Sequence, residues 1–408
     1  MKPILAGAGI LAAAMMTMTS GNAQSGSPSF GDDLAFLRQH KEVVLLTDRS
    51  HRAQVAVVPA WQGHVMTSTA GGAQGTSFGW VNRDLIAKGE IQPHINVFGG
   101  EDRFWLGPEG GQFSLFFARN APFDLEHWFT PAAFDTEPWA VVSRSADRVL
   151  CRHAFAVTNY SGTRFAVTAD REVRLVSARQ MLSGLGIQLP RGLRSVGFES
   201  VNSIRNTGPE PWKKDTGLLS IWILGMLNAS PQTTIVIPFA PGPESELGPV
   251  VNDTYFGKVP ADRLAVKDGA LFFAADAHHR SKIGIPPRRA KPVFGSYDAA
   301  HQVLTLIHYT RPPGATEYVN SMWQLQDKPF GGDAVNSYND GPSQPGGSQM
   351  GQFYELETSS PALALEPGQS ATHVHQTLHL QGAEKALDPI ARAALGVGLE
   401  EIKNALRR

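Results

Sequence analysis

The residues best suited to chemistry lie between Asn96 and Phe117, in the segment NVFGGEDRFWLGPEGGQFSLFF. Four charged side chains stand there among glycines and aromatic rings: Glu101, Asp102, Arg103 and Glu109. Buried charges need partners, or they change protonation state and become neutral. Two interpretations follow. The segment is either a concave site with an aromatic floor and convergent polar groups, or a surface loop braced by a solvated Glu101–Arg103 pair. We favour the concave site.

Glu101 and Arg103 would point the same way if the chain between them is extended, because alternate side chains share a side. They could then pair, and Arg103 would offer a planar fork of donors to hydroxyl or carboxylate oxygens. Trp105 would supply a ring on which a sugar can stack. Two Gly-Gly pairs and Pro108 argue against an ordinary strand here, whereas residues 113–117 have the apolar character of a buried strand.

A second acidic pair occurs far along the chain, in the segment FYELETS of residues 353–359. Glu355 and Glu357 are two positions apart, so both face the same side of a strand. Paired carboxylates can perform general acid–base chemistry, and a separation of about 5–10 Å would suit glycoside hydrolysis. The alternative is that both are solvent-facing residues of an alternating strand.

Other polar and aromatic residues are candidates for substrate contacts. They are His94, Gln112, Trp222, Lys282, Tyr338, Asn339 and Asp340. Lys282 could bind an anionic sugar such as a uronate or a sugar phosphate, although we favour a plain hairpin turn with solvated basic residues there. The Tyr-Asn-Asp run could bind hydroxyls at a cleft rim, or simply form a turn.

Three histidines alternate near the end of the chain, at His373, His375 and His379. That spacing can hold a metal, but it is more typical of a polar sheet face. We therefore predict no metal site and no cofactor, with calcium left as an open alternative.

Short β-branched runs separated by turn signals dominate residues 41–382 and predict one large antiparallel β-sandwich. The predicted strands include residues 43–46, 54–58, 64–68, 113–117, 148–158, 164–175, 195–206, 218–224, 233–239, 271–275, 303–309, 317–326, 353–358 and 371–380. Residues 24–40 are predicted to be a loose segment and a short helix capped by Asp32 or Asp33. Residues 383–408 are predicted to be helical, with Asp388 as cap and Pro389 at the first helical position.

Residues 1–23 have the pattern of a bacterial signal peptide: charged Lys2, an apolar run and small residues before a cut after Ala23. The apolar run is shorter than the ~20 residues of a spanning helix, so we expect a periplasmic or secreted protein and no membrane partner. Lys+Arg 36 against Asp+Glu 37 gives no basic surplus for nucleic acid. The single Cys151 cannot form a disulfide within the chain.

Three segments resemble the galactose-mutarotase-like superfamily (aldose epimerase-type proteins). They are Ser360-Pro361 with residues 363–380, Gly99-Gly100 with Trp105, and the segment VNSIRNTGPEPW of residues 201–212. The chain as a whole resembles an uncharacterised secreted bacterial family within that superfamily. The resemblance implies an all-β fold, a large antiparallel β-supersandwich with short peripheral helices, and a cleft that binds a carbohydrate. Fold similarity alone does not fix an activity.

Aldose mutarotation needs a base at the anomeric hydroxyl and an acid at the ring oxygen, which in this superfamily are usually Glu and His. The resemblance puts Glu357 at the base position. The glycine-rich segment of residues 96–117 supplies Glu101 and Glu109 as further catalytic candidates. The usual histidines are absent: Asn206-Thr207 and Trp222 stand where they are expected. Three hypotheses remain: a carbohydrate epimerase, hydrolase or lyase; a non-catalytic carbohydrate-binding protein; or a structural protein without a ligand.

Overall fold

The computed structural model describes residues 28–342 and 346–406. The predicted signal peptide and its cut after Ala23 lie outside the described residues, so both stay predictions. Within the described part of the chain, no helix is long and apolar enough to cross a membrane.

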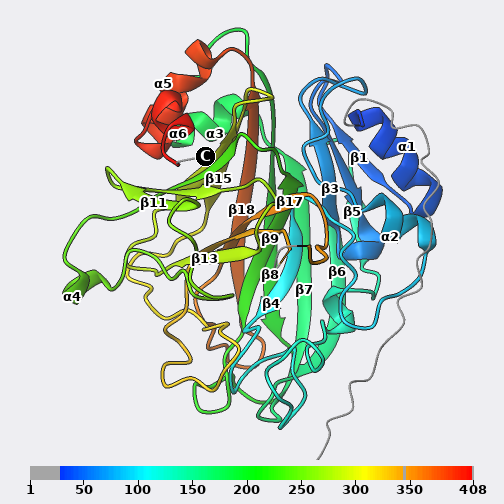
Figure 1. Cartoon of the computed structure of the whole chain (residues 1–408). Helices are drawn as coiled ribbons and strands as arrows, with labels where there is room; N and C mark the ends of the chain where they lie inside the picture. The colour runs from blue at the N-terminus through cyan, green and yellow to red at the C-terminus, as the bar shows by residue number, and fades with distance from the viewer. Residues whose placement is uncertain (1–27, 343–345, 407–408) are drawn as a thin grey trace, which may run out of the picture.

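The described chain forms three antiparallel sheets, which confirms the predicted all-β sandwich (Figure 1). In spatial order, the ten-stranded sheet contains β11 (Leu264–Lys267), β12 (Ala270–Ala274), β10 (Thr233–Pro238), β14 (Val293–Asp298), β15 (Val303–Tyr309), β18 (Ser370–Gln381), β8 (Arg194–Asn206), β7 (Arg164–Leu175), β6 (Arg148–Thr158) and β5 (Ala140–Arg144). The five-stranded sheet contains β13 (Ser281–Ile285), β16 (Val335–Asn339), β17 (Phe353–Ser359), β9 (Ser220–Asn228) and β4 (Arg103–Gly107). The small sheet contains β1 (Val44–Thr47), β2 (Gln54–Val58) and β3 (His64–Thr69).

The two larger sheets differ in how their outer faces are covered. On β7, buried residues such as Val167, Ala169 and Val173 alternate with partly exposed ones, as expected of a sheet with one wet face. Every residue of β4, β13, β16 and β17 is buried. Both faces of the five-stranded sheet are therefore covered. The sequences of its strands are mostly apolar, with a few charged residues between the apolar ones.

Short helices lie around the sheets. They are α1 (Phe30–His40), α2 (Arg83–Lys88), α3 (Ala178–Gly184), α4 (Glu244–Leu247), α5 (Glu384–Leu395) and α6 (Leu399–Lys403), with short 3-10 turns at Pro59–Trp61 and Ala132–Phe134. Figure 1 shows α5 and α6 beside α3, away from α1 and α2. The predicted first helix is present, but Ser29 rather than Asp32 or Asp33 is its cap.

The predicted start of the C-terminal helix is wrong by one turn, since α5 begins at Glu384 and contains Pro389 in its interior. Asp388 does not cap α5. Its Oδ1 accepts a hydrogen bond of 2.8 Å from the backbone N–H of Leu399, and its Oδ2 accepts one of 2.8 Å from Arg392 Nε. The carboxylate therefore ties α5 to the start of α6.

Three strand predictions are also wrong. Residues 103–107 form β4 despite the surrounding glycines, because they pair with β9 from Arg103↔Leu224 to Gly107↔Ser220. Residues 113–117 form no strand: Leu115 N–H donates to the carbonyl of Pro108 at 3.0 Å, which bends the segment back on itself. Residues 317–326 are loop, apart from one isolated bridge at Tyr318. In both loops, apolar side chains are buried by aromatic packing rather than by strand pairing.

Candidate functional site

A cavity of about 490 Å³ lies on the outer face of the five-stranded sheet. Its floor comes from side chains of the same parity on neighbouring strands. Trp105 of β4 lies opposite Trp222 of β9, and Glu355 of β17 pairs with Tyr338 of β16, which pairs in turn with Lys282 of β13. The strand register therefore gathers residues that are far apart in sequence.

Loops form the walls of this cavity. In Figure 1 the loops after β4 and before β16 lie close together beyond one end of the sheets, and Gln112 Nε2 joins them by donating to the carbonyl of Gln326 at 2.8 Å. Trp128 and Trp323, one from each loop, stack with ring centroids 5.9 Å apart. Trp105 and Trp222 meet edge to face at 5.5 Å. The result is a cavity lined by four indole rings.

Two ion pairs cross the floor. Arg103 Nη2 donates to Glu355 Oε1 at 2.6 Å, with both side chains nearly buried. Lys282 Nζ lies 3.1 Å from Glu357 Oε2. The same Glu357 oxygen accepts a hydrogen bond of 3.0 Å from Trp222 Nε1. Positive and negative groups thus alternate across strands β4, β17 and β13.

Burial and neighbouring charges shift the protonation of these groups. Burial raises the pKa of Glu355 to about 7, against the opposing effect of Arg103, and the charge of Glu357 adds to the increase. Burial also raises the pKa of Glu109, although Lys282 opposes it. Burial alone would lower the pKa of Lys282, but the charges of Glu357, Glu109 and Glu355 outweigh that effect and raise it. The site therefore holds a cation beside carboxyl groups that gain protons easily.

Two polar atoms of the ion pairs at the floor are buried without a hydrogen-bond partner among the described residues: Arg103 Nε, which lines the cavity, and Glu357 Oε1 beneath it. Buried polar atoms in proteins are usually satisfied, so each exception needs an explanation. Glu357 does not line the cavity itself; it lies behind Lys282 and Trp222, which do.

The expected Glu101–Arg103 pair is wrong. Arg103 pairs with Glu355. Glu101 precedes the first residue of β4, so the parity rule does not apply to it. Its Oε2 accepts hydrogen bonds from Ser68 Oγ at 3.0 Å and from His379 Nε2 at 2.7 Å, buried away from the cavity. Glu101 is thus part of the packing between sheets and does not share the cavity with Arg103 and Glu109.

The remaining predicted contacts divide into two groups. His94 and Tyr338 line the cavity together with Arg103, Glu109 and Lys282. Gln112 braces the loops described above, and Asn339 Nδ2 donates to the carbonyl of His279 at 3.0 Å, so neither lies in the cavity. Asp340 supports a lining residue, because its Oδ1 accepts from Tyr338 Oη at 2.7 Å.

The alternating histidines of β18 lie in the core. Thr358 Oγ1 is 2.9 Å from both His373 Nε2 and His375 Nδ1. Burial lowers the pKa of His373 to about 3 and that of His375 to about 4, so both rings are neutral at neutral pH. None of the three, His379 included, lines the cavity.

Sequence reasoning missed several lining residues that come from loops. They are Ile95, Leu125, Glu126, Trp128, Phe256, Arg280, Trp323 and Met350. The aromatic and proline-rich composition of residues 121–139 is a signal for an ordered loop of this kind. No strand or helix period marks which of its side chains turn inward.

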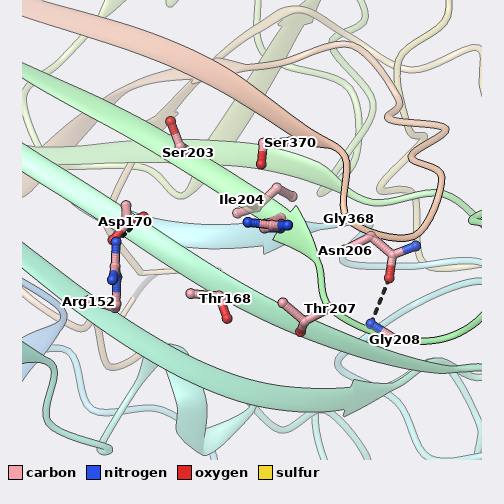
Figure 2. A pocket seen from close by; sticks show the side chains of 11 residues that line it. Arg152, Thr168, Asp170, Ser203, Ile204, Asn206, Thr207, Gly208, Gly368 and Ser370 are labelled. Atoms are coloured by element: carbon pink, nitrogen blue, oxygen red, sulfur yellow. Dashed lines mark hydrogen bonds and ion pairs between the residues drawn. The ribbon is translucent and has the colours of Figure 1, made fainter.

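A second depression, of about 470 Å³, lies on the exposed outer face of β6, β7, β8 and the start of β18 (Figure 2). Figure 2 shows Arg152 beside Asp170, and these side chains form an ion pair of 2.6 Å. Asn206 Oδ1 accepts from the Gly208 N–H at 3.0 Å and so holds a turn. This groove has no aromatic wall, and its ion pair is exposed to solvent. The cavity on the five-stranded sheet is therefore the better candidate site.

Comparison with known proteins identifies the class of fold first. The Slr1438 protein from Synechocystis sp. PCC 6803 is 12% identical, with a TM-score of 0.52 over 84% of this chain and 96% of its own. A proposed aldose 1-epimerase from Escherichia coli K12 is 13% identical, with a TM-score of 0.50 over 84% of this chain and 99% of its own. The chain thus has the predicted galactose-mutarotase-like fold.

The chain belongs to a family of unknown function, DUF6786, whose sequence pattern matches residues 28–406. This agrees with the predicted membership of an uncharacterised family. No curated protein sequence is significantly similar to the chain.

Proposed function

We propose that this protein is a carbohydrate-active enzyme that performs acid–base chemistry on a sugar bound in the tryptophan-walled cavity. One observation carries the proposal: two carboxyl groups of raised pKa, Glu109 and Glu355, line the same cavity as four indole rings. Perturbed carboxyl groups in a cleft are typical of catalytic acids and bases.

The composition of the cavity supports a sugar as ligand. Its volume of about 490 Å³ falls within the range of about 300–1,000 Å³ that small-molecule sites occupy. Indole faces suit the C–H faces of a pyranose ring. Arg103 and Lys282 supply donors for hydroxyl oxygens, and the carboxylates supply acceptors for hydroxyl protons. A purely apolar ligand would form no hydrogen bonds with these charged groups.

The reaction we propose is proton transfer at the anomeric centre. Glu109 takes the proton of the anomeric hydroxyl, and the electron pair of that O–H bond forms the second bond of the carbonyl group. The bond from the anomeric carbon to the ring oxygen breaks, and Glu355 gives that oxygen a proton. With a pKa of about 7, Glu355 can be either donor or acceptor at neutral pH, which allows the ring to close again.

A second candidate function is binding without chemistry, and one observation favours it. Glu357, the base position implied by the family resemblance, is held by Lys282 and Trp222 and does not line the cavity. A sugar would then be bound by the lining groups without reaching a base at that position.

We also propose that the protein works in the periplasm or outside the cell, after cleavage behind Ala23. The amino-terminal sequence pattern supports this proposal.

The rate of exchange between sugar anomers, measured by NMR for a panel of aldoses, tests whether the protein catalyses this reaction. The wild-type chain should accelerate exchange for at least one sugar. Glu109→Gln and Glu355→Gln should each reduce the rate by about 10²–10⁴-fold. Glu172→Gln is the matched control, because Glu172 lies on β7 of the other sheet and is partly exposed. Binding of a sugar without faster exchange would favour the second candidate.

A further inference from the structure

A second chamber of about 250 Å³ adjoins the main cavity. Both chambers are lined by Glu109, Leu125, Phe256, Arg280, Lys282 and Trp323. The smaller chamber adds Asp124, Tyr255 and Ser321. Because the shared residues form a common boundary, the two spaces are two parts of one cleft.

Arg280 stands at this boundary, and within the described part of the chain its side chain forms no ion pair and no hydrogen bond. Its guanidinium carbon lies 4.2 Å from the centre of the Phe256 ring, so the side chain is held by stacking. Its Nε is buried without a hydrogen-bond partner among the described residues. By contrast, Arg103 is paired with Glu355 and Lys282 with Glu357.

The carboxyl groups that line the two chambers with Arg280 are Glu109, Glu126, Glu355 and Asp124. Glu355 is paired with Arg103, and Asp124 Oδ1 lies 2.6 Å from His127 Nδ1. None of the four forms an ion pair with Arg280 within the described part of the chain. The guanidinium of Arg280 is therefore open to a negative group of a ligand.

We infer that the sugar carries a carboxylate, as a uronic acid does, and that Arg280 binds this carboxylate where the two chambers meet. The inference rests on the proposed function, since it names the substrate class of the same site. A guanidinium and a carboxylate match as two parallel N–H···O bonds. A sugar phosphate offers similar oxyanion chemistry, but its charge of about −1.5 to −2 exceeds what one unpaired cation balances beside Glu109.

Isothermal titration calorimetry of the full chain at neutral pH tests the inference with two matched series of sugars. The first series is glucose, glucuronate and glucose 6-phosphate, and the second is the same three forms of galactose. We expect the uronate to bind about 10–100-fold more tightly than its neutral parent, the factor that a charged hydrogen bond provides. Arg280→Gln should remove this preference, so that the uronate binds no more tightly than its neutral parent. Arg280→Lys should retain part of it, because the charge stays and the fork is lost.

Arg205→Gln is the matched control, since Arg205 is an exposed arginine in the groove on the other sheet. It should leave every affinity unchanged. Equal binding of neutral and acidic sugars, unaltered by Arg280→Gln, would overturn the inference and leave the proposed function intact. Preference for the phosphate would overturn the assignment of a carboxylate. Absence of binding to every sugar tested would overturn both the inference and the proposed function.

Discussion

Replacing Lys282 by methionine should destabilise the protein strongly, because it leaves a buried charge behind. Lys282 and Glu357 are 8% and 0% exposed, and their charged atoms are 3.1 Å apart. Removing one partner of a buried ion pair costs about 3–5 kcal/mol, since the other charge stays in a poorly solvating environment. The hydrogen bond from Trp222 to the same carboxylate oxygen persists, but it does not neutralise Glu357.

The expected change is measurable by thermal unfolding. For a chain of this size, a loss of about 4 kcal/mol corresponds to a fall in Tm of roughly 5 °C, using an unfolding entropy of about 2.1 cal/mol/K per residue. The double variant Lys282→Met with Glu357→Gln should recover most of the loss, because it removes the unpaired charge. Differential scanning calorimetry of the wild type, both single variants and the double variant gives the interaction free energy between Lys282 and Glu357.

The pH dependence supplies a second readout for the same pair. The pKa of Lys282 is raised in the folded state, so its contribution to stability is complete below the usual lysine value and is lost as the pH rises through the raised value. The wild type should therefore lose stability in alkaline solution, and Lys282→Met should lack that loss. An unchanged Tm in Lys282→Met, together with an unchanged alkaline slope, would refute the claim that this pair is buried and coupled.

Three further predictions follow from the site and the sequence. Trp105→Ala should lower stability by about 3–5 kcal/mol, because the ring is 5% exposed and packs on Trp222 and Phe116; an unaltered Tm would contradict that packing. Because the pKa of Glu355 is raised to about 7, its contribution to stability is complete below its usual pKa and is lost as the pH rises through 7. In Glu355→Gln, the unfolding free energy measured by chemical denaturation should no longer fall as the pH rises through 7. If the variant kept this pH dependence, Glu355 would not be its source. Intact-mass measurement of protein from the periplasm should show that residues 1–23 are absent, and their retention would disprove export with cleavage after Ala23.

Much of the fold could be predicted because strand signals are local. Turn residues between β-branched runs mark strands such as β2, and the alternation on β7 marks a half-exposed face. The residues 113–117 and 317–326 mislead the same reasoning, because an apolar run buried by a covering loop has the composition of a buried strand. Local sequence does not distinguish the two.

The site could be predicted only where strand parity decides it. Glu355 lines the cavity from a predicted strand, and its orientation follows from parity. The favoured hairpin turn with solvated basic residues at Lys282 is wrong, because Lys282 lies on β13 and is buried against Glu357. Glu101 could not be placed, because it lies before β4 begins and its partner His379 is 278 residues away in sequence. Trp323 and Arg280 reach the cavity from outside the strands, and their inward orientation depends on tertiary packing.

The central claim is that the cavity on the five-stranded sheet binds a carbohydrate. A crystal structure of the protein with the tightest-binding sugar of the calorimetric series tests it most directly. The account predicts a sugar ring between Trp222 and Trp323, within hydrogen-bond distance of Glu109 and Glu355. A sugar bound instead in the groove beside Arg152 and Asp170, with the tryptophan-walled cavity empty, would contradict it.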